Sequence, residues 1–209
     1  MISKAEANKK YFREAYRTGQ HGWQTEPSPY IVRCLDRLSK ELPAAGLLDL
    51  GCGEGRHSIA AAQRGFRVTG VDFEPGALKR ARAAAHAAGT PRPRFLPADA
   101  LSLPFAAGSF AVIIDFGCFH HQRKADWPAY RRSILRALQP GGFLVLSVFG
   151  PRFRFFKGAK RNWHIVRGAY RRCFARKELP ALFGTDFKML SLSEDAAGLW
   201  HALLRRREG

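Results

Sequence analysis

One segment constrains the fold more than any other: the glycine-rich stretch LLDLGCGEGR, which runs from Leu47 to Arg56. A short apolar run ends at Gly51, three glycines alternate with other residues, and a helical pattern follows over residues 56–64. Glycines permit a tight turn and close approach of a ligand to the backbone. The free N–H groups and positive dipole end of the helix favour a carboxylate or a phosphate. The segment therefore predicts a strand–loop–helix unit that binds a ligand.

Two acidic residues distinguish this loop from a dinucleotide-binding loop. Asp49 precedes the glycines inside the predicted strand. A carboxylate there would sit badly beside a pyrophosphate, but it suits the cationic amino-acid end of S-adenosylmethionine. Asp72 ends the next predicted strand, 21 residues after Gly51. An acid at that point can accept hydrogen bonds from both ribose hydroxyls.

Short apolar runs alternate with helical patterns along the chain. Strands are expected at 47–50, 67–71, 94–96, 110–114 and 143–149, and helices at 7–17, 56–64, 75–88 and 125–138, the last ending at the turn Pro140-Gly141-Gly142. This alternation predicts a parallel sheet covered by helices on both faces. After a helix at 177–183, the runs 187–193 and 199–204 are expected to form an antiparallel hairpin at the sheet edge. We expect one α/β domain over residues 1–209.

The ordered set of motifs resembles the class I S-adenosylmethionine-dependent methyltransferases. The matching stretches are LLDLGCGEGRH, GFRVTGVDFEPGAL, FLPADALSLPF, FAVIIDFGCFHH and LQPGGFLVLSVF, which together cover about residues 30–150. The resemblance implies a Rossmann-like, mostly parallel seven-stranded sheet in the order 3-2-1-4-5-7-6, with the seventh strand antiparallel. It also implies S-adenosylmethionine as the cofactor, with S-adenosylhomocysteine as the product.

The resemblance assigns the cofactor to residues at the ends of the first four strands. The residues implied at the methionine end are Asp49, Gly51, Cys52 and Gly53. Asp72 is implied at the ribose. Phe73, Asp99 and Ala100 are implied at the adenine. Asp115, which ends the fourth strand, is expected beside the transferred methyl group and is a catalytic candidate. Asp99 taken alone would equally fit a helix cap.

The arm formed by residues 1–30 is rich in aromatic side chains. It resembles the arm of the thiopurine and tellurite-resistance type of small-molecule methyltransferases, which cover the cofactor with an N-terminal helix and a tryptophan loop. Trp23 is expected over the sulfonium, because a cation over an aromatic ring is attracted by about 0.5–2 kcal/mol. Tyr11 is expected to contact the substrate. The alternative is that these rings only pack the arm onto the core.

The sequence DFGCFHH follows the fourth predicted strand, at the sheet edge where ligands bind in open α/β folds. Imidazole titrates near neutral pH, so we expect His120 to act as a general base for a hydroxyl acceptor. His121 is expected to contact the substrate. A thiol acceptor would react as its anion without a base. Either histidine could instead only order the loop.

Residues 151–177 contain ten Lys or Arg and no acid, in a chain of net charge +18. One interpretation is a substrate lid whose arginines, Arg152 among them, hold an anionic small molecule. A second is an RNA-binding surface, and a third is a solvated basic face. We favour the lid, because no RNA-binding module is recognisable and neither N-P-P-Y nor D-P-P-Y follows the fourth strand. A non-catalytic cofactor-binding partner subunit is a further alternative.

Several classes are disfavoured by composition. The four cysteines form no C-x-x-C pair, so we expect no zinc or other metal site. The first ten residues are polar and resemble no signal peptide, and no apolar run approaches about 20 residues. We therefore expect a reduced, cytoplasmic protein with no membrane partner. Oligomeric state stays open.

Overall fold

A seven-stranded sheet forms the centre of the chain, in a computed structural model that describes residues 4–19, 25–89 and 93–208. Its strands are β1 (Gly46–Leu50), β2 (Arg67–Asp72), β3 (Arg94–Pro97), β4 (Phe110–Phe116), β5 (Leu138–Phe149), β8 (Phe187–Glu194) and β9 (Leu199–Arg206). The order across the sheet is β3-β2-β1-β4-β5-β9-β8. β8 and β9 are the sixth and seventh strands of this sheet in chain order, so the observed order is the expected 3-2-1-4-5-7-6.

Two further strands, β6 (Trp163–Val166) and β7 (Ala169–Arg172), pair with each other in an antiparallel ribbon that is separate from the seven-stranded sheet. This ribbon lies inside the basic 151–177 segment, for which the sequence predicts no strand. The expected terminal hairpin is confirmed as β8–β9. Its second strand is not at the edge, however, because β9 pairs with β5 on its other side.

Eight helical segments connect and cover the strands in the described part of the chain. They are α1 (Lys4–Thr18), α2 (Pro29–Glu41), α3 (Arg56–Ala62), α4 (Pro75–Ala87), the 3-10 turns η1 (Phe119–His121) and η2 (Lys124–Asp126), α5 (Trp127–Ala137) and α6 (Glu178–Phe183). The sequence analysis does not predict α2, although its signal is present. Pro29 opens the helix, and the buried residues Ile31, Cys34, Leu35 and Leu38 have helical spacing.

The expected turn at Pro140-Gly141-Gly142 lies within β5, which begins at Leu138. The pairing with β4 jumps from Phe110–Leu138 to Val112–Phe143. The three residues therefore form part of an irregularity that interrupts the ladder without ending the strand.

Alternate residues of the central strands enter two separate apolar layers, as a sheet covered on both faces requires. Leu48 and Leu146 pack with α5 and α6 on one face, whereas Leu47 and Val145 pack with α2 and α3 on the other. No helix in the described part of the chain is long and apolar enough to cross a membrane.

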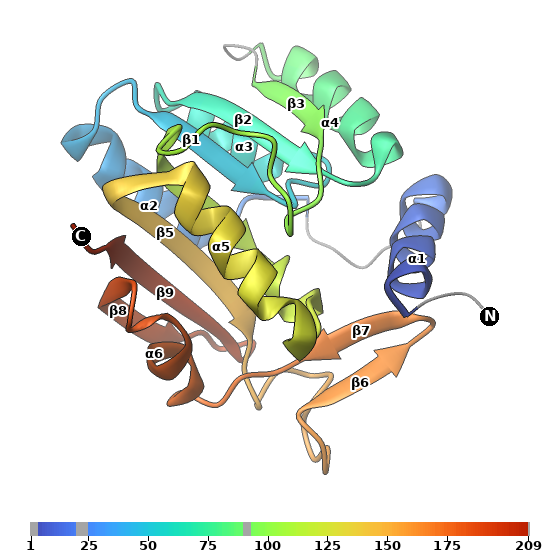
Figure 1. Cartoon of the computed structure of the whole chain (residues 1–209). Coiled ribbons are helices and arrows are strands. Elements are labelled where there is room, and N and C mark those ends of the chain that lie inside the picture. The colour runs from blue at the N-terminus through green and yellow to red at the C-terminus, as the bar shows by residue number, and fades with distance from the viewer. Residues whose placement is uncertain (1–3, 20–24, 90–92, 209) are drawn as a thin grey trace.

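The carboxyl ends of the parallel strands meet at one edge, and α1 and the β6–β7 ribbon gather there (Figure 1). The Asn8 side-chain oxygen of α1 accepts the backbone N–H of Tyr170 in β7 at 3.0 Å. Two segments from opposite ends of the sequence thus lie together over the edge that the glycine loop occupies.

Candidate functional site

The glycine loop turns from β1 into α3 through left-handed backbone conformations. The φ angles of Gly51, Gly53 and Gly55 are +69°, +54° and +85°. A Cβ on Gly53 would stand 2.7 Å from the hydroxyl oxygen of Tyr16 in α1. A side chain at position 53 would therefore strain the backbone and would have to displace the Tyr16 side chain.

Asp49 lies near the end of β1, just before this loop, with its carboxylate out of solvent. The side chain is 1% exposed, and its Oδ2 accepts a hydrogen bond from the Ser58 hydroxyl at 2.6 Å. Burial raises the pKa of Asp49 to about 6. A buried carboxylate with one short hydroxyl donor favours a cationic ligand, because an ammonium group would stabilise its charged form.

Asp72 and Glu74 lie together at the end of β2. Asp72 accepts the backbone N–H groups of Gly53 at 3.0 Å and Glu74 at 2.9 Å, and burial raises the pKa of Asp72 to about 6. Asp72 therefore connects the end of β2 to the glycine loop. Glu74 caps α4 through Oε1, while its buried Oε2 has no hydrogen-bond partner among the described residues and lies 3.5 Å from the Nε of Arg13. Sequence reasoning missed Glu74, although it stands only two residues after Asp72.

The predicted adenine end is covered by the first helix. Phe12 packs edge-on against Phe73 with ring centroids 5.9 Å apart, and Lys9 Nζ lies 3.2 Å from Asp99 Oδ2. Ala100 is buried beside this acid. The other oxygen of Asp99 accepts the N–H of Leu101 at 3.0 Å within a turn. Because no helix begins at residues 99–103, the helix-cap interpretation of Asp99 is wrong.

The α1 helix therefore forms a cover over the glycine loop, the β2 end and Asp99. Tyr16 contacts the loop, and burial raises the pKa of its phenol, which keeps its proton and can donate a hydrogen bond. Cys52 is buried in the same loop. Trp23, expected over the sulfonium, lies outside the described residues.

We expect that neutralising the ion pairs of α1 will speed cofactor release. In the double variant Lys9→Gln/Arg13→Gln, labelled S-adenosylmethionine should dissociate about two- to tenfold faster, because exposed pairs contribute about 0–1 kcal/mol each. Rapid filtration after dilution measures this rate. The matched control is Arg17→Gln, since Arg17 pairs with Glu14 of its own helix. Equal acceleration in the control would contradict the cover.

Asp115 is fully enclosed at the end of β4. Its carboxylate accepts the N–H groups of Cys118 and Phe119 and the hydroxyl of Tyr130, the last at 2.6 Å. Burial raises the pKa of Asp115 to about 6. These contacts order the loop that carries the two histidines and connect it to α5.

His120 and His121 differ in which ring nitrogen is engaged. The Nδ1 of His120 accepts the backbone N–H of Phe149 at 3.3 Å, so a neutral ring carries its proton on Nε2. The Nδ1 of His121 lies 2.6 Å from the carbonyl oxygen of Tyr170 and must donate to it, which leaves the lone pair on Nε2. Burial lowers the pKa of both rings, to about 4 for His121. Only His121 therefore presents a nitrogen that can accept a proton.

Tyr11 and His121, two predicted substrate residues, lie around Phe12. The His121 ring packs edge-on against Phe12 at 4.9 Å, and Tyr11 packs against the same ring at 5.2 Å. Arg171 of β7 donates to the Tyr11 hydroxyl at 3.1 Å. The third predicted substrate residue, Arg152, is instead 68% exposed and paired with Glu194 at 3.5 Å. Sequence reasoning missed Arg171, because nothing distinguishes it from nine other cations in the segment.

The site suits S-adenosylmethionine on the chemistry of its own groups. Asp49 offers a buried carboxylate to an ammonium group, Asp72 and Glu74 lie at and just after the end of β2, and the glycines leave the backbone bare. No metal is needed to explain the acids, and the described residues contain no group of three His, Cys, Asp or Glu side chains that could hold one.

Comparison with known proteins agrees with this assignment. Residues 47–142 match the family described as a methyltransferase domain. The chain is 40% identical over 122 residues to demethylmenaquinone methyltransferase of Thermus thermophilus, covering 57% of this chain and 53% of that protein. It is 36% identical over 138 residues to 27-O-demethylrifamycin SV methyltransferase of Amycolatopsis mediterranei, covering 62% and 50%. The chain thus spans about half the length of these curated relatives.

The fold also matches solved methyltransferase structures. One is the Burkholderia thailandensis 1,6-didemethyltoxoflavin-N1-methyltransferase with bound 1,6-didemethyltoxoflavin and S-adenosylhomocysteine. It superposes with a TM-score of 0.77 at 24% identity, over 98% of this chain and 89% of that one. Residues 47–142 therefore match a methyltransferase domain, and the chain has the fold of solved methyltransferases.

Proposed function

We propose that this chain transfers the methyl group of S-adenosylmethionine to a small molecule bound between α1, η1 and β7. The observation that carries the proposal is the cluster of Tyr11, Phe12, His121 and Arg171, whose side chains contact one another or β7 at the edge of the sheet where β1 and Asp49 end. Aromatic side chains with a few polar groups among them are typical of small-molecule sites. The named relatives also act on small molecules.

The proposed roles follow from the contacts. Asp49 binds the ammonium group, the Gly51–Gly53 backbone lines the methionine end, Asp72 with Glu74 accepts the ribose hydroxyls, and Phe73 with Asp99 borders the adenine. When bound, the cofactor supplies an activated methyl group on a positively charged sulfur. The enclosing residues align the acceptor and exclude water, and alignment alone can contribute about 7–11 kcal/mol.

Proton removal is assigned to His121 rather than to His120, for acceptors that must lose a proton. Its Nε2 holds the available lone pair, while its Nδ1 is fixed by the Tyr170 carbonyl. His120 can donate a hydrogen bond from Nε2. Asp115 is a positioning residue, because its contacts order the backbone that precedes both histidines.

A screen with labelled S-adenosylmethionine tests the proposal. The acceptors are thiols, phenols, small acids, amines and bulk RNA. We expect transfer to at least one small-molecule class. Cofactor binding without transfer to any acceptor would favour the partner-subunit alternative. The helical cover agrees with our further proposal that the chain belongs near the thiopurine and tellurite-resistance type.

A second candidate, RNA methylation, is favoured by the outer face of the basic segment. Seven of its cations are exposed and have no carboxylate partner among the described residues: Arg154, Lys157, Lys160, Arg161, Arg167, Arg176 and Lys177. If these bind RNA, filter retention of labelled RNA should fall by orders of magnitude between low and moderate salt. Absence of retention at low salt would exclude this candidate.

A further inference from the structure

Arg171 is a buried cation for which the described part of the chain supplies no counter-charge. The residue is 9% exposed and lies in β7, over the acceptor side of the site. Its one hydrogen bond in the described structure goes to the neutral hydroxyl of Tyr11. Its guanidinium lies over the Phe155 ring at 4.3 Å and over the Tyr11 ring at 5.7 Å. No carboxylate lies within 4 Å of it in the ranges that the structure describes.

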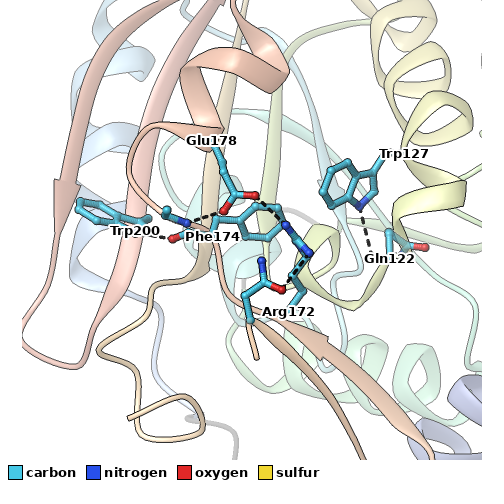
Figure 2. Close-up of polar contacts among 8 residues, drawn as sticks. Gln122, Trp127, Arg172, Phe174, Glu178 and Trp200 are labelled. Carbon is cyan, nitrogen blue, oxygen red and sulfur yellow. Dashed lines mark hydrogen bonds and ion pairs between the residues drawn. The ribbon is translucent and has the colours of Figure 1, made fainter. Parts of the chain in front are cut away.

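The neighbouring Arg172, in contrast, has a carboxylate partner. Figure 2 shows Arg172 directed at Glu178, which it meets at 2.6 Å, while Glu178 also accepts the N–H of Ala175. Arg152 has Glu194 in the same way. The contrast separates Arg171 from the other arginines of the segment: it is neither paired like Arg172 nor exposed like Arg154.

An uncompensated buried cation is costly, because the protein interior solvates a charge poorly. The two rings and the Tyr11 hydroxyl offset part of that cost, and their arrangement leaves guanidinium donors for another acceptor. The charge also acts on its surroundings: burial is the main reason why the pKa of His120 and of His121 is lowered, and Arg171 lowers both further. A bound anion would therefore both pair with the arginine and cancel its part of the lowering at His121.

We propose that Arg171, with the Tyr11 hydroxyl, binds an anionic group of the acceptor, so that the natural acceptor is a planar aromatic acid carrying a carboxylate. Carboxylate geometry suits a guanidinium, which can offer two parallel N–H donors. The aromatic frame is inferred from the rings around the arginine: Tyr11, Phe12 and Phe155. This inference rests on the proposed function and specifies its substrate class.

Calorimetry on the full chain saturated with S-adenosylhomocysteine tests it. The probes are benzoate, phenylacetate and 2-naphthoate, each compared with its uncharged amide. We expect at least one acid to bind the wild type more tightly than its amide, and Arg171→Gln to weaken that acid by about 10- to 150-fold. Affinity for the amide should not change. Arg171→Lys keeps the charge but loses the two parallel N–H donors, so its affinity for the acid should lie between those of the wild type and Arg171→Gln.

Two controls keep the outcomes separate. Arg154→Gln removes an exposed cation that also lies over Phe155, at 5.0 Å, and should leave acid binding unchanged. Thermal unfolding of Arg171→Gln should occur at the wild-type temperature or higher, because a purely structural arginine would destabilise the protein when removed. Equal binding of acids and amides, no binding of any acid, or no effect of Arg171→Gln would overturn the inference. Failure of S-adenosylhomocysteine to bind would instead overturn the proposed function.

Discussion

Asp49→Asn is expected to weaken S-adenosylmethionine binding by roughly 30-fold or more, while the cofactor-free protein stays at least as stable as the wild type. The affinity falls because the ammonium group loses a buried, oppositely charged partner. The stability does not fall, because the fold disfavours this charge. Burial raises the pKa of Asp49 to about 6, so the ionised carboxylate costs folding free energy at neutral pH. Asparagine removes that cost and can still accept from Ser58.

The pH dependence gives the same test a second readout. Because the folded pKa of Asp49 lies above its usual value, its contribution to stability is greatest at low pH and is lost as pH rises toward about 6. Cofactor binding runs the other way and should weaken as pH falls below about 6, where Asp49 takes up a proton. Titration calorimetry between pH 5 and pH 8 covers about one pH unit or more on either side of this pKa. It should show cofactor affinity falling toward acid pH in the wild type and falling less in Asp49→Asn.

Asp115→Asn is the matched comparison, since Asp115 is also buried and its pKa is also about 6. Its oxygens are engaged by Cys118, Phe119 and Tyr130, so this change should affect stability more than cofactor affinity. Equal loss of affinity in the two variants would contradict the assignment of Asp49 to the ammonium group.

The geometry around the proposed cofactor residues could be predicted from sequence because it is local. Asp49, Gly53 and Asp72 belong to one β1–α3–β2 unit, whose turn and strand ends are set by neighbouring residues. The strand order was expected from the resemblance of the ordered motifs to class I S-adenosylmethionine-dependent methyltransferases, and the sheet has that order. What the sequence could not supply was the contact of α1 with β7, which joins Asn8 to Tyr170 across the whole chain.

The acceptor half depended on such distant contacts. His120 and His121 are equivalent as neighbours in a sequence, and they differ only because Phe149 donates to one and Tyr170 accepts from the other. In the same way, Arg152 and Arg171 are both arginines of a basic segment. Glu194 at the end of β8 and Tyr11 of α1 decide their different environments.

The second large effect concerns those histidines. His121→Gln is expected to lower kcat by about 100-fold or more for a hydroxyl or amine acceptor, with little change in KM, because general-base catalysis contributes about 10²–10⁴-fold. Glutamine can still donate to the Tyr170 carbonyl, so the loop should keep its place, but its remaining group cannot take up a proton. His120→Gln is the control at the adjacent position and should cost much less. Single-turnover rates with the acceptor found by the screen measure both.

The pH profile separates proton removal from mere positioning. Burial, with a further contribution from Arg171, lowers the pKa of His121 to about 4, so the free enzyme holds Nε2 unprotonated throughout the neutral range. The rate should therefore be flat at neutral pH and fall only toward acid, as His121 becomes charged. An anionic acceptor bound to Arg171 would move this fall in rate to higher pH, because the anion cancels the positive charge that disfavours the imidazolium form of His121. Arg171→Gln should shift the fall in rate in the same direction. If His120→Gln abolishes turnover and His121→Gln does not, the base is His120, and the ring that donates to Tyr170 only orders the loop.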